Sequence, residues 1–89
     1  MTTGRLEKLI ADLSSFVKER YPEAIIQVSY SAYDGEDADM EIFVDSGMEA
    51  DLHDALSQKA AEILVDEGYH IATLVYPLED YEKRRVKTL

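Results

Sequence analysis

Near the middle of the chain, two carboxylates, Asp39 and Glu41, lie on either side of Met40. This spacing of two residues places both side chains on one face of a β-strand. In an extended segment the side chains of residues i and i+2 leave the same face, roughly 6.5–7 Å apart along the chain. Both can then reach one Mg²⁺ ion, which proteins hold with one or two carboxylates while water and substrate phosphates supply the other ligands. Phosphoryl-transfer sites use acids in this way. The alternative interpretation is that a solvent-facing strand in a very acidic protein simply carries acids.

The residues around this pair predict a β-hairpin. Apolar and polar positions alternate from residue 39 to 45, which favours a strand covered on one side: Met40, Ile42 and Val44 share one face, and Asp39, Glu41, Phe43 and Asp45 share the other. Residues 24–33 alternate in the same way and predict the first strand. Asp34 and Gly35 supply the turn between the two strands. We therefore expect one face of the hairpin to be lined by Gln27, Ser29, Ser31, Asp39 and Glu41.

Helices are predicted on both sides of the hairpin. Apolar residues at steps of three and four indicate a helix over residues 5–20 that ends before Pro22. Ser46 and Glu49 fit a capping box for a second helix that runs to Glu67, with Gly68 as its left-handed C-terminal residue. Residues 69–76 are rich in β-branched and aromatic side chains and predict a third strand that Pro77 ends. Residues 78–89 predict a short C-terminal helix with Pro77 at its first position.

These elements predict one α+β domain over residues 1–89, with the order helix, strand, strand, helix, strand. We expect a small mixed three-stranded sheet with two helices on one face and the short C-terminal helix after it. A chain of 89 residues is long enough for one core and too short for a second.

The charge balance restricts the partners. With 19 acidic and 9 basic residues the formal charge is −10, which disfavours direct binding to nucleic acid or to an anionic membrane. A nucleotide would need a bound metal ion. Salt would relieve the self-repulsion, so a salt-rich, halophilic cytoplasm is a reasonable hypothesis. The chain has no cysteine, no apolar run of about 20 residues and no signal-peptide pattern, and we expect a cytoplasmic protein without a membrane span.

The element order and the acidic pair together resemble the minimal nucleotidyltransferase domains of the DNA polymerase beta superfamily. Asp39-Met40-Glu41 is similar to the acidic pair that the family carries on its second strand, and residues 74–83 are similar to the strand exit and following helix of small prokaryotic members. The likeness spans most of the chain. Tyr30-Ser31 stands where the family has Gly-Ser, and residues 69–76 contain no third acid, with His70 and Thr73 as the polar candidates.

The resemblance implies a site and a reaction. Asp39 and Glu41 would be the catalytic acids and the Mg²⁺ ligands, and Ser31 and Gly35 would contact a nucleotide such as ATP. The reaction would transfer a nucleotidyl group to a partner protein, because small family members often act as antitoxins that pair with a helical ribonuclease-type toxin. The alternative partner is a second copy of the chain in a homo-oligomer. Two alternatives stay open: an inert family member that acts as a protein-binding module, and an acidic domain without nucleotide chemistry.

Overall fold

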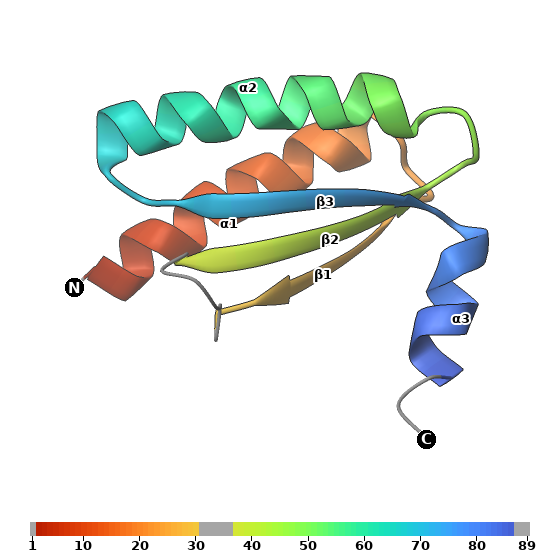
Figure 1. Ribbon diagram of the computed structural model, residues 1–89. Coiled ribbons are helices and arrows are strands. Elements are labelled where there is room, and N and C mark those ends of the chain that lie inside the picture. The colour runs from red at the N-terminus through yellow and green to blue at the C-terminus, as the bar shows by residue number, and fades with distance from the viewer. Residues whose placement is uncertain (1, 31–36, 87–89) are drawn as a thin grey trace.

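The protein forms three helices and three strands, which a computed structural model describes for residues 2–30 and 37–86 (Figure 1). In chain order these are α1 (Thr2–Arg20), β1 (Ile25–Ser29), β2 (Ala38–Val44), α2 (Glu49–Glu67), β3 (Ile71–Pro77) and α3 (Glu79–Val86). The predicted element order and the α+β class with a mixed three-stranded sheet are confirmed.

The sheet has β2 at its centre, with β1 antiparallel on one side and β3 parallel on the other. The register aligns Ser29, Asp39 and Ala72 in one row across the three strands, and Gln27, Glu41 and Leu74 in the next row. Residues in one row project from the same face of a sheet. Each carboxylate of β2 therefore has one neighbour from each outer strand.

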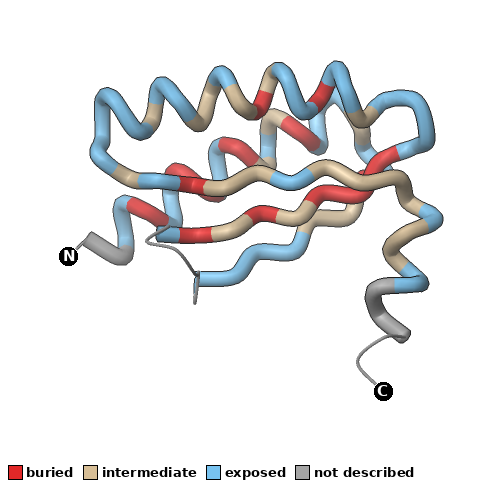
Figure 2. The backbone as a smooth tube through the Cα atoms, in the orientation of Figure 1, coloured by how far each residue is buried: buried red, intermediate tan, exposed pale blue. Residues whose placement is uncertain are grey.

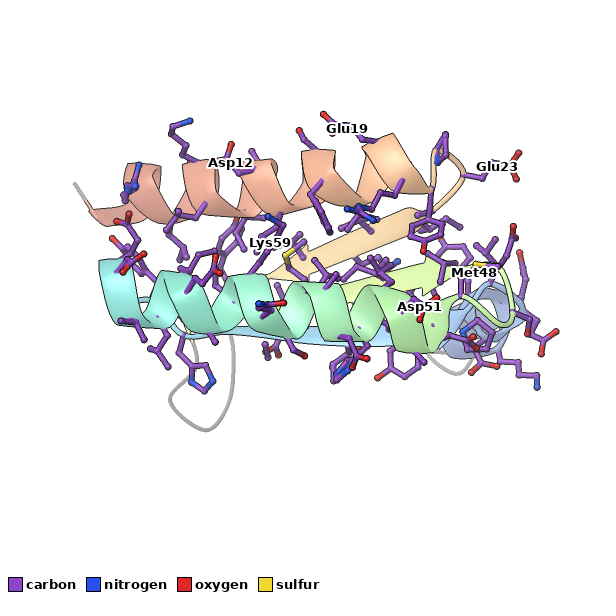
Figure 3. The ribbon with its side chains drawn as sticks, turned by 90° about the horizontal axis from the view of Figure 1, so that it is seen from above. Asp12, Glu19, Glu23, Met48, Asp51 and Lys59 are labelled. Carbon is purple, nitrogen blue, oxygen red and sulfur yellow. The ribbon has the colours of Figure 1, made fainter. Side chains whose placement is uncertain are left out.

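The helices α1 and α2 run antiparallel to each other and lie side by side on one face of the sheet (Figures 1 and 3). The buried segments recur along both helices and along β2, whereas much of β1 is exposed (Figure 2). One apolar cluster fills the space between the helices and the sheet. Its members come from the helix layer, from the sheet and from the segment before β1: Leu6, Leu9, Ile10, Leu13, Val17, Ala24, Ala38, Met40, Ile42, Val44, Leu52, Leu56 and Ile71.

Contacts at the rim join the two helices. The Arg5 guanidinium donates two hydrogen bonds to the Glu67 carboxylate, with Nε to Oε1 at 3.1 Å and Nη2 to Oε2 at 2.6 Å. Further along, Lys59 of α2 lies between the helices in Figure 3, and its Nζ is 4.6 Å from the centre of the Phe16 ring. The Arg20 guanidinium lies at the same distance from that ring. Phe16 is therefore a contact point for two cations in a chain with few basic residues.

The predicted capping box at the start of the second helix is wrong. The helix begins at Glu49, its N-cap is Met48, and no side chain caps it. Residues 45–48 form a tight turn instead, in which the Met48 N–H donates to the Asp45 carbonyl at 3.0 Å. The Glu49 carboxylate accepts a hydrogen bond of 2.6 Å from the Gly47 N–H. Because the chain turns first, Ser46 lies too early to reach the free N–H groups of the first helical turn.

The C-terminal half follows the predictions with small shifts. Gly68 has a φ of 81°, and its N–H donates to the carbonyls of Ile63 and Leu64, as predicted for the residue that ends α2. Pro77 is the last residue of β3 rather than the first of a helix, and α3 begins at Glu79. A proline is tolerated there because the end of an edge strand needs no further donor.

Candidate functional site

Asp39 and Glu41 project from the sheet face that α1 and α2 leave open. Their neighbours Ala38, Met40 and Ile42 are completely buried under the helices, and successive residues of a strand point to opposite faces. The prediction that the two carboxylates share one face is confirmed by this alternation and by the register of β2. They occupy the middle strand, so neighbours on both sides can contribute to a site.

A shallow hollow of about 620 Å³ lies over this part of the open face. It is lined by Gln27, Val28, Ser29, Asp39 and Glu41. In the strand register, Ser29 lies beside Asp39 and Gln27 lies beside Glu41. A hydroxyl and an amide can donate or accept hydrogen bonds, and carboxylates can only accept them while ionised. The hollow therefore combines two anionic groups with two neutral polar groups that could orient a ligand.

One oxygen of the site is unusual. The Oδ1 atom of Asp39 is buried and has no hydrogen-bond partner among the described residues. Burying a carboxylate oxygen without a partner costs free energy, and such groups are rare in folded proteins. The Asp39 carboxylate is therefore held at a cost in free energy.

The donor set fits a hard cation whose coordination is completed by its ligand. Mg²⁺ binds through one or two carboxylates and keeps its other positions for water and phosphate oxygens, and Asp39 and Glu41 are two such groups. Within the described ranges, no cluster of three or more potential metal-ligating side chains is present. The arrangement is therefore suited to a metal that arrives with a phosphate ligand rather than to a closed structural metal site.

The third strand contributes no acid to the open face. Ala72 lies beside Asp39 and Leu74 beside Glu41, and Leu74 is 41% exposed. Thr73, a polar candidate from the sequence, is paired with Met40 and so belongs to the helix-covered face. It cannot take the place of a third carboxylate in this hollow.

His70, the other candidate, is not among the residues that line the hollow, and its backbone contacts Asp37. Its backbone N–H donates to Asp37 Oδ2 at 2.7 Å, and its carbonyl accepts from the Asp37 N–H at 2.8 Å. These bonds join the start of β2 to the start of β3, just outside the hollow. Asp37 was not predicted to have a role, because the spacing of two residues 33 positions apart gives no sign of such a contact.

The open face is closed at one end by α3. Phe43 follows Asp39 and Glu41 on the same face, yet it is completely buried. Its ring stacks on Tyr76 at 5.5 Å between centroids and meets the edge of Tyr81 at 5.3 Å. In Figure 1, α3 descends from the end of β3 on the side away from α1 and α2. The hollow is thus bounded by an aromatic cluster of Phe43, Tyr76 and Tyr81.

No family model matches the chain. Searches of characterised proteins and of solved structures give no match either. Any functional inference must therefore come from the site itself and from the resemblance of its residues. Ser31 and Gly35, the two predicted nucleotide contacts, lie at residues 31–36, outside the described residues. Among the described helices, none is long and apolar enough to cross a membrane.

Proposed function

We propose that this protein is a nucleotidyltransferase-like domain that binds a Mg²⁺-nucleotide complex on the open face of its sheet. The observation that carries the proposal is the pair of carboxylates on the central strand, Asp39 and Glu41, which line one hollow of the open face. The element order and the mixed sheet are compatible with the resemblance described above. Because Mg²⁺-ATP is an intracellular compound, the proposal includes a cytoplasmic location.

In this proposal Asp39 and Glu41 hold the metal from the central strand. Bound Mg²⁺ would neutralise phosphate charge and favour in-line attack of a hydroxyl on the nucleotide. Ser29 and Gln27 supply a hydroxyl and an amide beside the two acids, where they can hydrogen-bond phosphate or sugar oxygens. A chain of charge −10 repels a free triphosphate, so nucleotide binding requires the metal.

The reaction that the resemblance favours is transfer of a nucleotidyl group to a hydroxyl of a partner protein. The acceptor oxygen would bond to the α-phosphorus of ATP while the bond from that phosphorus to the bridging oxygen breaks, so that pyrophosphate would leave and the hydroxyl proton would pass to solvent. A second candidate function is an inert member that only binds its partner. It is favoured by Ala72 and Leu74, which place apolar side chains where a third carboxylate would complete the site.

A titration with Mg²⁺ and ATP, followed by backbone amide NMR, tests the proposal. We expect shifts at Ser29, Asp39 and Glu41 with both components present and none with ATP alone. Asp39→Ala should abolish the shifts. Asp45→Ala is the matched control, because it removes an exposed carboxylate just past the end of β2 and outside the hollow. Silence at these amides with about 10 mM Mg²⁺-ATP, far above the usual range of substrate affinities, would reject the proposal.

A substitution that adds a carboxylate separates the two candidates further. Ala72→Asp places an acid beside Asp39 in the register. If the open face is a metal site that lacks one ligand, this variant should bind Mg²⁺ about tenfold more tightly than the natural chain. Leu64→Asp, at an exposed position of α2, adds the same charge far from the hollow and should leave Mg²⁺ affinity unchanged. Equal effects of the two variants would indicate general electrostatics and favour the inert module.

A further inference from the structure

The open face of the sheet differs on the two sides of its acids. Beside the two carboxylates of β2, the strand β1 contributes Ser29 and Gln27 to this face, whereas β3 contributes Ala72 and Leu74. The first two side chains carry a hydroxyl and an amide, and the other two carry no hydrogen-bonding group. A ligand over the acids therefore meets polar groups toward β1 and an apolar surface toward β3.

Leu74 is a large apolar side chain that the fold leaves in contact with solvent. It is 41% exposed, whereas Ile71, on the other face of the same strand, is buried in the core. Its neighbours along β3 on the open face are Ala72, which has only a methyl side chain, and Tyr76, whose ring stacks on Phe43. A single exposed leucine is common on protein surfaces, and what distinguishes this one is its position beside the acids.

This difference would orient a nucleotide that binds through its metal. Phosphate oxygens accept hydrogen bonds, and donors for them are available from the β1 side chains but not from Ala72 or Leu74. The hollow lies on that polar side, because Gln27, Val28 and Ser29 line it together with the acids. The sugar of a nucleotide separates the base from the phosphates. The base can therefore lie over β3, which is one strand spacing of about 4.8 Å from the central strand.

We propose that Leu74 packs against the base of the nucleotide, while the triphosphate and its metal lie in the hollow on the β1 side. This inference rests on the function proposed above and adds the orientation and the class of the ligand. Contact with a base would remove the exposed apolar surface of Leu74 from water. A purine offers a larger ring surface for this contact than a pyrimidine does, so the ligand class is the purine nucleoside triphosphates.

Calorimetric titrations of the full chain with saturating Mg²⁺ compare ligands with and without a base. The natural chain should bind ATP about tenfold more tightly than methyl triphosphate, which has the same charge and no base. Leu74→Ala should weaken ATP binding about fivefold and leave methyl triphosphate binding within about twofold. The preference for ATP over UTP should shrink in the same variant. Leu64→Ala is the matched control, because Leu64 is 46% exposed on α2, away from the open face, and it should leave both affinities unchanged.

A second substitution separates contact with the base from damage to the fold. Leu74→Phe replaces the aliphatic side chain by a ring on which a base can stack, so this variant should bind ATP at least as tightly as the natural chain. Circular dichroism shows whether each variant folds. If Leu74→Ala does not fold, Leu74→Thr replaces it, because threonine is suited to a strand and also removes apolar surface, and the same loss of ATP affinity is expected.

The outcomes distinguish this inference from the function on which it rests. Equal affinities of the natural chain for ATP and methyl triphosphate would overturn the contact with the base and leave the proposed metal and phosphate site intact. A loss of ATP affinity in Leu74→Ala that methyl triphosphate or the Leu64→Ala control shares equally would overturn it in the same way. If neither ATP nor methyl triphosphate binds the natural chain with Mg²⁺, the proposed function is rejected and this inference with it.

Discussion

The two faces of the sheet differ in what they do although the same strand builds both. On one side of β2, Ala38, Met40, Ile42 and Val44 are all 0–1% exposed beneath two helices. On the other side, Asp39 and Glu41 line an open hollow, and only Phe43 is covered. Alternate residues therefore belong to different physical environments.

This difference teaches that stability and binding are separable in this domain. The apolar cluster lies entirely between the helices and the sheet, so the open face can carry acids without weakening it. The two acids on that face still repel each other, which is a cost that a bound cation would remove. A substitution on the covered face of β2 should therefore mainly lower stability, whereas a substitution on the open face should mainly weaken ligand binding.

The largest effect is expected from truncation on the covered face. Ile42→Ala removes a completely buried side chain from the centre of the cluster and should lower the free energy of unfolding by about 2–5 kcal/mol. Glu41→Ala, one residue away on the other face, should lower it by less than Ile42→Ala does, because Glu41 lies outside the apolar cluster. Urea denaturation of both variants measures the contrast. Similar losses for the two variants would show that the faces are not separable.

A smaller effect is expected where the open face is closed. Tyr81→Ala removes the edge contact with Phe43 and part of the cover that α3 gives to the sheet. We expect a loss of about 1–2 kcal/mol, because an aromatic pair contributes up to about 1.5 kcal/mol beyond the area that it buries. Faster hydrogen exchange in α3 with unchanged exchange in α2 would confirm that the two helices stabilise different faces. Tyr81→Phe keeps the ring and should lose less stability than Tyr81→Ala.

Ligand-linked stability tests the open face directly. If the hollow binds Mg²⁺, adding the ion at ten times its dissociation constant should stabilise the natural chain by about 1.4 kcal/mol. Asp39→Asn should lose this gain while unfolding at the same temperature as the natural chain, or a higher one, in the absence of metal. Asp45→Asn should keep the gain. Thermal unfolding with and without Mg²⁺ measures all three, and an equal gain in Asp39→Asn would place the ion elsewhere.

The alternation that defines these two faces was predictable from the sequence, because a period of two is a local property of β2. The Gly68 helix end and the stop before Pro22 were predictable for the same reason. The capping box failed because a competing local turn at residues 45–48 delays the helix. Two motifs that fit the same residues cannot be ranked without knowing where the strand ends.

The closure of the open face was not predicted, because it depends on contacts across long sequence separations. Phe43 and Tyr81 are 38 positions apart, and α3 had no assigned place in the domain. One signal was available in the sequence. Phe43 shares a strand face with two carboxylates, and a large apolar ring at such a position is expected to be covered by another element. The resemblance to nucleotidyltransferases predicted nucleotide contacts at Ser31 and Gly35. Both residues lie outside the described ranges, so these contacts stay predictions.

The smallest effect is expected at the rim of the covered face, where Arg5 and Glu67 join α1 to α2. The two hydrogen bonds from the Arg5 guanidinium hold the pKa of the Glu67 carboxyl below its usual value. A carboxyl whose pKa is lower in the folded state stabilises the fold above its unfolded pKa, about 4.3, and loses that effect as the pH falls through the folded value. Arg5 has a raised pKa, and its effect would be lost only in strong alkali.

Glu67→Gln should therefore lower the unfolding temperature slightly at pH 7, by a few degrees at most, since the pair is exposed and salt weakens it. The difference from the natural chain should disappear below about pH 4, where the carboxyl is protonated in both states. Glu62→Gln removes the same charge from α2 while keeping the Arg5 pair, so it corrects for the general relief of repulsion in this acidic chain. A difference between Glu67→Gln and Glu62→Gln that persists where NMR titration shows the Glu67 carboxyl protonated in the folded chain would mean that Glu67 contributes by packing rather than by charge.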